Sequence, residues 1–203
     1  MTKTKFAPAI KSRPVYGELE VRTGKTHLLI ADAAGAGAIL DLAKNAPKGF
    51  LGSAHIIYVP NDSGDKFVAK LEKLGAKQCY IGPSFEAARQ RIQRVLTSAT
   101  NGLQIYLAGT EGLMGQAMRE AIEVGYPYSA IQTEHRGSKA RRMQCVHCKG
   151  ITEDVTTDPF VCAHCGLNLF VRDHYSRRLA AFQGVCIDAE DPGNVPKSVE
   201  IAS

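Results

Sequence analysis

The stretch THLLIADAAGAG, residues 26–37, decides the fold of the longer part of this chain. Residues 26–31 form a short apolar run bounded by turn formers, which is the pattern of a strand buried on both faces of a parallel sheet. Residues 32–37 are small, and apolar residues then recur at helical spacing over 38–44. Strand, small-residue loop and helix together form the opening of a β-α-β unit.

Segments of the same two kinds follow in alternation as far as residue 133. Strands are predicted over 54–59, 77–81, 103–108 and 129–133, and helices over 65–74, 85–98 and 113–124. Ser84 is the expected N-cap of one of these helices, because its hydroxyl can accept from the first free amides. Strands separated by helices of this length imply a parallel sheet covered on both faces. The predicted fold class is therefore α/β, a doubly wound parallel sheet followed by a small four-cysteine metal ribbon.

The composition changes on either side of the predicted sheet, which we place at residues 25–135. Residues 1–24 are polar with scattered Pro and Gly, and we expect an N-terminal arm there. Residues 136–143 are predicted to be a linker. Residues 144–186 carry paired cysteines and few helix signals, and they form the predicted metal-ribbon domain. Residues 187–203 are rich in acidic residues, Pro and Gly, and are expected to be a loose tail.

Four of the six cysteines fall into two C-x-x-C pairs. Cys145 pairs with Cys148, and Cys162 pairs with Cys165, with 13 residues between the pairs. Two cysteines at this spacing can present both sulfurs to one metal from a tight turn, and two such turns complete a tetrahedron. The sequence therefore predicts one metal ion held by four thiolates.

The residues around the pairs bear on the metal. Gly150 and Gly166 follow the two pairs and are expected to turn the backbone with positive φ. Residues 158–166 resemble the second knuckle of rubredoxins, although Ala163 stands where those proteins usually carry Pro, and Lys149 stands where they usually carry Gly. Zinc in a structural role is the preferred interpretation. Iron that relays single electrons is the alternative, because ligand type does not separate the two metals.

Bulk properties exclude some classes of protein. No apolar run approaches the roughly 20 residues that span a bilayer, and residues 1–6 lack the apolar core of a signal peptide. We therefore expect a cytoplasmic protein without a membrane partner. The formal net charge is +5, and several of the basic residues lie within 136–149. A solvated linker is the preferred interpretation of that segment. The alternatives are a zinc-ribbon nucleic-acid-binding or regulatory protein and a surface that docks an acidic protein partner.

Two segments of the predicted sheet resemble the nucleotide domain of the ferredoxin-NADP reductase family. Residues 28–37 are similar to that family's first strand and glycine loop, and residues 105–114 to its C-G-P-x-x-M segment. The resemblance implies a dinucleotide site, for which the candidate residues are Ala34, Gly35, Gly37, Gly109 and Thr110.

The same resemblance has clear departures. Ala108 replaces the cysteine that the family carries beside the nicotinamide, and the first 25 residues are too few for a flavin-binding barrel. We therefore expect a nucleotide-binding or docking module. A free-standing NAD(P)H reductase component is the alternative, and no catalytic residue is assigned.

The segment RDHYSRR, residues 172–178, follows the second cysteine pair. Together with both halves of the chain it resembles the A subunit family of bacterial dimethylamine monooxygenase. That family implies a cytoplasmic, multisubunit, NAD(P)H- and O2-dependent enzyme that converts dimethylamine to methylamine and formaldehyde. Partner subunits would carry haem, flavin and iron–sulfur centres, and this chain would have a structural or electron-relay role. A density of Arg, His and Tyr is typical of interfaces, and the candidates are Arg172, His174, Tyr175, Arg177 and Arg178.

Overall fold

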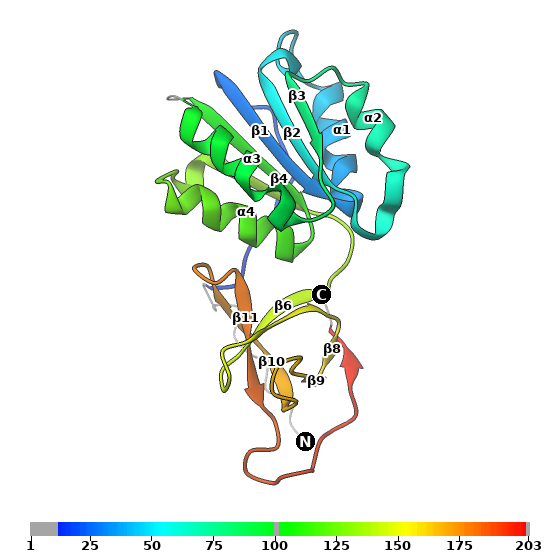
Figure 1. Cartoon of the computed structure of the whole chain (residues 1–203), viewed down its shortest axis with the longest axis vertical. Coiled ribbons are helices and arrows are strands. Elements are labelled where there is room, and N and C mark those ends of the chain that lie inside the picture. The colour runs from blue at the N-terminus through cyan, green and yellow to red at the C-terminus, as the bar shows by residue number, and fades with distance from the viewer. Residues whose placement is uncertain (1–11, 100–101, 202–203) are drawn as a thin grey trace. The chain divides into compact units, whose positions relative to one another are not determined.

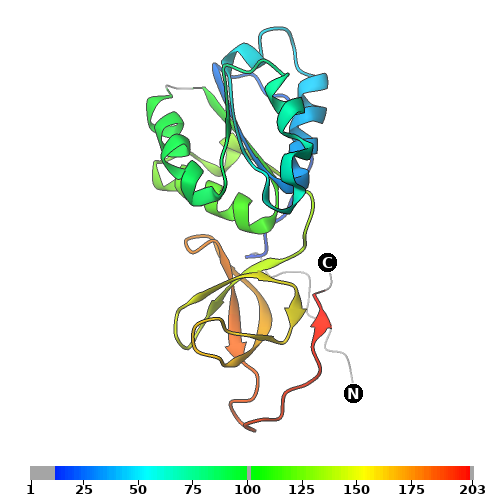
Figure 2. The same ribbon diagram turned by 45° about the vertical axis from the view of Figure 1, so that its right-hand side comes forward.

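The computed structural model describes residues 12–99 and 102–201 of the chain. Among these residues, Tyr16–Lys139 form one compact unit, and residues 12–15 with 140–201 form the other. The first unit is a sheet covered by helices, and the second is made of strands (Figures 1 and 2). None of the helices in the described part of the chain is long and apolar enough to cross a membrane.

The α/β unit contains a five-stranded sheet in the order β3-β2-β1-β4-β5, and all four strand pairs are parallel. The strands are β1 (Thr26–Asp32), β2 (Ala54–Val59), β3 (Gln78–Ile81), β4 (Leu103–Gly109) and β5 (Ile131–His135). The chain builds the sheet outward from β1 in one direction and then from β4 in the other. The strand order therefore reverses between β1 and β4, which is where ligands bind in sheets of this kind.

Helices cover both faces of this sheet (Figure 1). They are α1 (Ala36–Lys44) and α2 (Val68–Glu72) on one face, and α3 (Phe85–Ser98) and α4 (Glu111–Glu123) on the other. Alternate residues of β1 enter the two apolar layers, Leu28 and Ile30 beneath α3 and α4, and Leu29 and Ala31 beneath α1. The predicted doubly wound parallel sheet is confirmed.

Most predicted elements match the observed ones closely, but the helix expected over 65–74 does not. The chain instead forms the short helical segment η3 (Asn61–Lys66) and then the brief α2. Gly64 interrupts the turn with φ 52 and ψ −144, a combination that no helical residue adopts. Three short turns complete the unit, η1 (Ala33–Gly35), η2 (Leu51–Ser53) and η4 (Tyr128–Ala130).

The predicted N-terminal arm differs from what the structure shows after residue 15. The amide of Gly17 donates to the carbonyl of Thr133, and the amide of Leu19 donates to the carboxylate of Glu134 at 2.8 Å. The side chain of Leu19 also packs against the apolar layer beneath α1. Residues 16–24 therefore belong to the α/β unit, while residues 1–11 of the predicted arm lie outside the described part of the chain.

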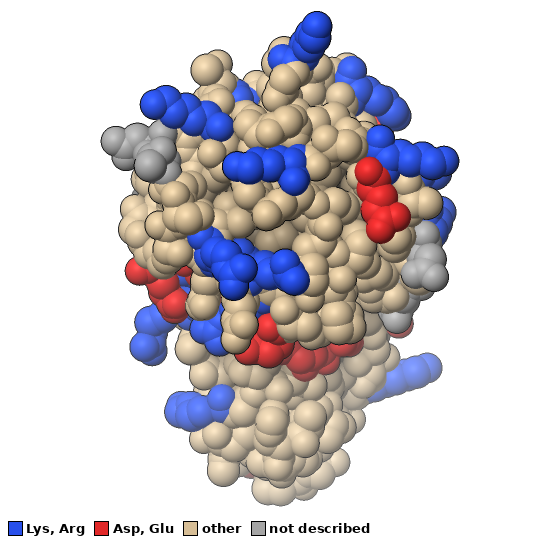
Figure 3. Space-filling model, turned by 45° about the horizontal axis from the view of Figure 1, so that its top comes forward, with Lys and Arg blue, Asp and Glu red and all other residues tan. Residues whose placement is uncertain are grey.

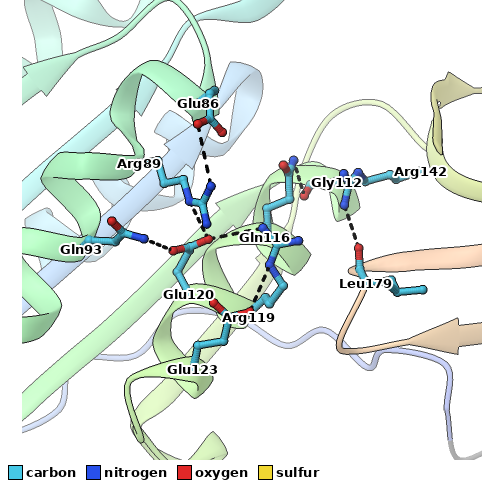
Figure 4. Close-up of polar contacts among 10 residues, drawn as sticks. All are labelled: Glu86, Arg89, Gln93, Gly112, Gln116, Arg119, Glu120, Glu123, Arg142 and Leu179. Atoms are coloured by element: carbon cyan, nitrogen blue, oxygen red, sulfur yellow. Dashed lines mark hydrogen bonds and ion pairs between the residues drawn. The ribbon is translucent and has the colours of Figure 1, made fainter. Parts of the chain in front are cut away.

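A buried carboxylate joins α3 to α4 (Figure 4). The side chain of Glu120 on α4 is 1% exposed, and it accepts from Gln93 at 2.7 Å and pairs with the Arg89 guanidinium at 2.9 Å. Arg119 approaches the same carboxylate at 3.3 Å. A charge this deeply buried is tolerated only when its lone pairs are satisfied. The network therefore fixes which flank of α3 faces α4.

The second unit holds a five-stranded sheet in the order β7-β6-β11-β10-β9, in which only the β6–β11 pair is parallel. The strands are β6 (Arg141–Cys145), β7 (Ile151–Val155), β9 (Phe160–Val161), β10 (Asn168–Ser176) and β11 (Ala181–Cys186). A separate two-stranded pair joins β8 (Thr157–Asp158) to β12 (Val199–Glu200). The apolar core beneath the sheet is small and includes Met143, Leu169 and Phe182.

Two predicted segments of this unit have more structure than expected. The predicted linker ends inside β6, where the buried Arg141 stacks on Phe182 and donates to Asp173 at 2.8 Å. The predicted loose tail contains strand β12, and Ile201 directly after this strand packs against the core. Both segments are held by partners far away in the sequence, which composition alone does not reveal.

The contact between η1 and β4 gives the first prediction. A Cβ built on Gly35 would overlap the carbonyl group of Ala108 near the carboxyl end of β4. Gly35→Ala should therefore lower the free energy of unfolding by about 1–3 kcal/mol, because backbone cannot move aside as a flexible side chain can. Gly52→Ala is the control, since nothing lies within 4 Å of a Cβ at that position. Urea unfolding followed by circular dichroism measures both, and an unchanged midpoint for Gly35→Ala would contradict the close contact.

Candidate functional site

The second unit brings four sulfurs together. The Sγ atoms of Cys145, Cys148, Cys162 and Cys165 all lie within 4.8 Å of one another. Cys145 and Cys165 are 3.8 Å apart, and Cys148 and Cys162 are 3.7 Å apart. A tetrahedral ion with metal–sulfur bonds of about 2.3 Å needs its sulfurs about 3.8 Å from one another. The donor set therefore fits one four-coordinate metal ion.

Each cysteine pair sits on a tight turn of the same design. The amide of Lys149 donates to the carbonyl of Cys145, and the amide of Gly166 donates to the carbonyl of Cys162, both at 3.0 Å. Lys149 and Gly166 adopt φ values of 64 and 73. These positive values reverse the chain directly after the second sulfur of each pair, so both sulfurs point inward.

The expected role of Gly150 was wrong, because Lys149 and not Gly150 carries the positive φ of the first turn. Gly150 instead donates its amide to the sulfur of Cys148 at 3.4 Å. A Cβ on Gly150 would overlap the imidazole of His164, which is held by a 2.7 Å hydrogen bond with the carbonyl of Ile151. The glycine therefore makes room for a ring that braces the two turns against each other.

The electrostatics of the cluster suit a cation. Burial raises the pKa of Cys162, but hydrogen bonds from the amides of Cys165 and His164 outweigh that effect and lower the pKa to about 6. For Cys165, the Leu167 amide lowers the pKa, yet burial and the neighbouring sulfurs raise it to about 12. Four sulfurs this close cannot all ionise unaided, and a metal ion removes the conflict by binding all of them as thiolates.

A second candidate site is the crevice at the carboxyl ends of β1 and β4, where the strand order reverses. The carboxylate of Asp32, 1% exposed, accepts from the Thr110 amide at 2.8 Å and from the Thr110 hydroxyl at 2.6 Å. Asn61 donates to the same carboxylate at 3.0 Å. Thr110 is also the N-cap of α4, since its hydroxyl accepts from the Leu113 amide. A negatively charged side chain therefore takes the position that a ligand phosphate would need at the start of this helix.

The five residues predicted to hold a dinucleotide lie in two different places in the α/β unit. Gly109, with φ 125, leaves space for the Asp32 carboxylate, and Gly35 packs on β4 beside it. Ala34 instead faces Gly137, and Gly37 faces the guanidinium of Arg136. The sequence interpretation missed the pairing of Asp32 with Thr110, because the two residues are 78 positions apart.

The segment RDHYSRR, residues 172–178, extends the metal ribbon and is called the ribbon extension; it is mostly exposed, with one exception. Tyr175, predicted to be at an interface, is 8% exposed, and its ring centroid lies 4.9 Å from that of Phe182. This tyrosine therefore belongs to the core of its unit, which corrects the prediction for that residue. The other four predicted interface residues are exposed: Arg172, His174, Arg177 and Arg178.

The basic segment that raised the nucleic-acid alternative is largely neutralised within its own units. Its arginines form ion pairs at 2.7–2.8 Å with nearby carboxylates, and a guanidinium paired in this way is less available to a phosphate backbone. The pairs are Arg136 with Glu134, Arg141 with Asp173, and Arg142 with Glu153.

Comparison with known proteins adds the family. The model of the N-terminal domain of the dimethylamine monooxygenase subunit DmmA-like family matches residues 8–131, and the model of its C-terminal domain matches residues 142–185. The chain belongs to the DmmA-like family. A curated relative from Ectopseudomonas mendocina (strain ymp), the heme-dependent oxidative N-demethylase delta subunit, is 31% identical over 110 residues. That match covers 54% of this chain and 63% of the relative, which is less than two thirds of its length.

Two solved structures are similar to part of this DmmA-like chain. The flavohem-like FAD/NAD binding domain of nitric oxide dioxygenase from Vibrio cholerae O1 biovar El Tor has a TM-score of 0.41 at 18% identity, covering 62% of this chain and 56% of that one. Flavohemoglobin from Malassezia yamatoensis has a TM-score of 0.36 at 13% identity, covering 56% and 32%. The fold class itself rests on the observed strand order.

The metal centre gives a second prediction. Structural zinc contributes about 10 kcal/mol or more to the folding of small domains, so Cys162→Ala should release the metal and unfold residues 140–201. All four α-helices of the described residues lie in the other unit, so the circular dichroism at 222 nm should stay nearly unchanged. Amide exchange by NMR and metal analysis measure the two effects.

Cys186→Ala is the matched control for this change. Cys186 lies outside the four-sulfur set, and its thiol donates to Asp188 at 3.3 Å. This variant should keep one metal ion per chain. Loss of the metal from Cys186→Ala, or its retention in Cys162→Ala, would contradict the assigned ligand set.

The crevice gives a third prediction, on pH. Burial raises the pKa of Asp32 above its ordinary value, although hydrogen bonds from Thr110 oppose the shift. With a raised folded-state pKa, the stabilising effect of this group is fully present below about pH 4 and is lost as pH rises through the folded pKa. The free energy of unfolding of Asp32→Asn, relative to the parent chain, should therefore increase between pH 4 and pH 7.

Asp41→Asn should show the opposite dependence at lower pH. Relative to the parent chain, its free energy of unfolding should increase as pH falls below about 4 and stay nearly constant between pH 4 and pH 7. Hydrogen bonds from Lys44 and Arg136 lower the pKa of Asp41, so its contribution is present above its unfolded pKa and is lost as pH falls through the folded pKa. Urea unfolding at several pH values measures both variants. Parallel trends for the two would contradict the buried environment of Asp32.

Proposed function

We propose that this chain is a non-catalytic subunit of a multicomponent, NAD(P)H- and O2-dependent amine monooxygenase that converts dimethylamine to methylamine and formaldehyde. Membership of the DmmA-like family is the observation that carries the proposal. The relative described as a subunit of a heme-dependent oxidative N-demethylase supports the same class of reaction. On this proposal the complex is cytoplasmic, and its haem, flavin and iron–sulfur centres belong to partner subunits.

The chemistry of the four-sulfur site supports a role other than catalysis. A metal bound by four thiolates has no open position for water or substrate, whereas catalytic zinc sites keep one. Zinc would hold the turns and strands of the ribbon together and would supply no redox chemistry. Iron in the same ligands would relay single electrons, and the exposure of Cys148 and Cys165 would bring it near the surface for that purpose.

The α/β unit is proposed to dock a partner subunit and not to transfer hydride. Asp32 already accepts hydrogen bonds from the amide and hydroxyl of Thr110, and its charge would repel a pyrophosphate at the crevice. The dinucleotide residues suggested by the reductase resemblance would then be remnants of an ancestral site. Calorimetric titration with NADH and NADPH tests this directly, because saturable binding at micromolar affinity would overturn it.

Metal analysis with a visible spectrum separates the two roles of the ribbon. One zinc per chain and no absorption in the visible range are expected for a structural ribbon. One iron per chain, with a red colour that dithionite bleaches, would establish an electron relay through this subunit instead.

Assembly gives a fourth prediction. Arg172 and Arg178 are exposed on and beside β10, and replacing both with Glu should weaken co-purification with partner subunits at least tenfold through like-charge repulsion and lost pairing. The control is the double variant Lys48→Glu/Lys197→Glu, which makes the same change in net charge. Both lysines are exposed and lie outside the ribbon extension, so this variant should leave co-purification intact. Equal yields of complex from both double variants would exclude the ribbon extension as an interface.

A further inference from the structure

A pocket of about 330 Å³ lies in the α/β unit at the end of the sheet opposite the crevice. It is formed by the first residues of β2 and β3 and by the second half of α3. Ligands of doubly wound sheets usually bind at the carboxyl ends of the strands, so this pocket is separate from the site discussed above. Its lining residues are His55, Ile56, Ile57, Gln78, Cys79, Tyr80, Arg91, Arg94 and Val95.

The charged groups of this pocket are all of one sign. Arg91 and Arg94 contribute two guanidinium groups, and within the described part of the chain no Asp or Glu side chain lines the pocket. The described ion pairs of α3 engage Arg89, with Glu86 and Glu120, and not these two arginines. Lys and Arg side chains also outnumber acidic ones on the face of this unit drawn in Figure 3. A concentration of unpaired positive charge in a recess favours an anionic ligand.

The packing of α3 explains why these two arginines point into the pocket. Arg89 and Gln93, four positions apart, face α4 and its buried Glu120 (Figure 4). Arg91 and Arg94, three positions apart, therefore lie together on the other flank of the helix, above the edge strand β3. The same buried network that joins the helices thus fixes the direction of the basic flank.

Two further contacts organise the pocket in advance of a ligand. The Arg91 guanidinium stacks on the Tyr80 ring at 4.1 Å, which orients its planar donors. The imidazole of His55 is hydrogen-bonded through Nδ1 to the amide oxygen of Gln78 at 2.9 Å. That contact uses the oxygen of the carboxamide, so the NH2 group of Gln78 is not used by it and can donate. The recess therefore combines two fork-shaped cations with a neutral donor.

We propose that this pocket binds a small molecule that carries a phosphate group. Guanidinium groups match phosphate oxygens with two parallel hydrogen bonds, and two of them balance the charge of a phosphate monoester, about −1.5 to −2 at pH 7. The volume exceeds that of a phosphate group alone and leaves room for the rest of a small metabolite. The proposal does not rest on the function of the complex, since every group in it belongs to this chain.

Titration of the full-length chain with inorganic phosphate, followed by amide NMR shifts at constant ionic strength, tests the proposal. Shifts that saturate and cluster at the amides of residues 55–57, 78–80 and 91–95 are expected. Arg91→Ala and Arg94→Ala should each weaken the affinity at least tenfold, and Arg91→Lys should weaken it less than Arg91→Ala, because charge remains while the fork is lost.

Lys48→Ala is the matched control, since it removes one exposed positive charge outside the pocket and should change the affinity less than twofold. Unchanged circular dichroism of the arginine variants shows that the loss is local. The proposal is overturned by absence of saturable binding, by unchanged affinity in the Arg91→Ala/Arg94→Ala double variant, or by equal weakening in Lys48→Ala. Tighter binding of citrate than of phosphate at the same residues would overturn the phosphate assignment in favour of a carboxylate ligand.

Discussion

The pairing of Asp32 with Thr110 is the interaction on which the α/β unit depends. It joins the end of β1 to the start of α4 across the point where the strand order reverses. The position of α4 places Glu120, Glu120 holds Arg89, and Arg89 fixes which flank of α3 faces the sheet edge. One buried carboxylate thus accepts the hydrogen bonds offered at the start of α4, and a second one directs the basic flank of α3 at the opposite end of the same sheet.

The second unit depends on a different constraint. Its apolar core is small, and domains of this size rarely bury enough surface to be stable without a metal or disulfides. The four sulfurs meet this need by joining two turns that follow separate strands. Because all four coordination positions are filled by protein, the centre is suited to holding structure or passing electrons and not to binding substrate. On the proposed function, the centre would support a reaction that partner subunits carry out.

Two groups of arginines have different consequences. Those at residues 136–142 are paired with carboxylates of their own unit and contribute to folding. Those at 91, 94, 172 and 178 present their charge to solvent. Net charge alone does not distinguish these groups, although only the second is available to a ligand or a partner.

The sequence by itself determined the features that depend on near neighbours. Apolar periodicity gave the α/β order and the bounds of β2 and α3, Ser84 was recognisable as a cap, and cysteine spacing indicated the metal ligands. Only the tertiary structure decided features that join distant positions. Asp32 meets Thr110 across 78 residues, Tyr175 packs into the core, and His55, Gln78 and Arg91 share one pocket. Local patterns report which backbone conformation is favourable, whereas burial and pairing depend on how separate elements pack together.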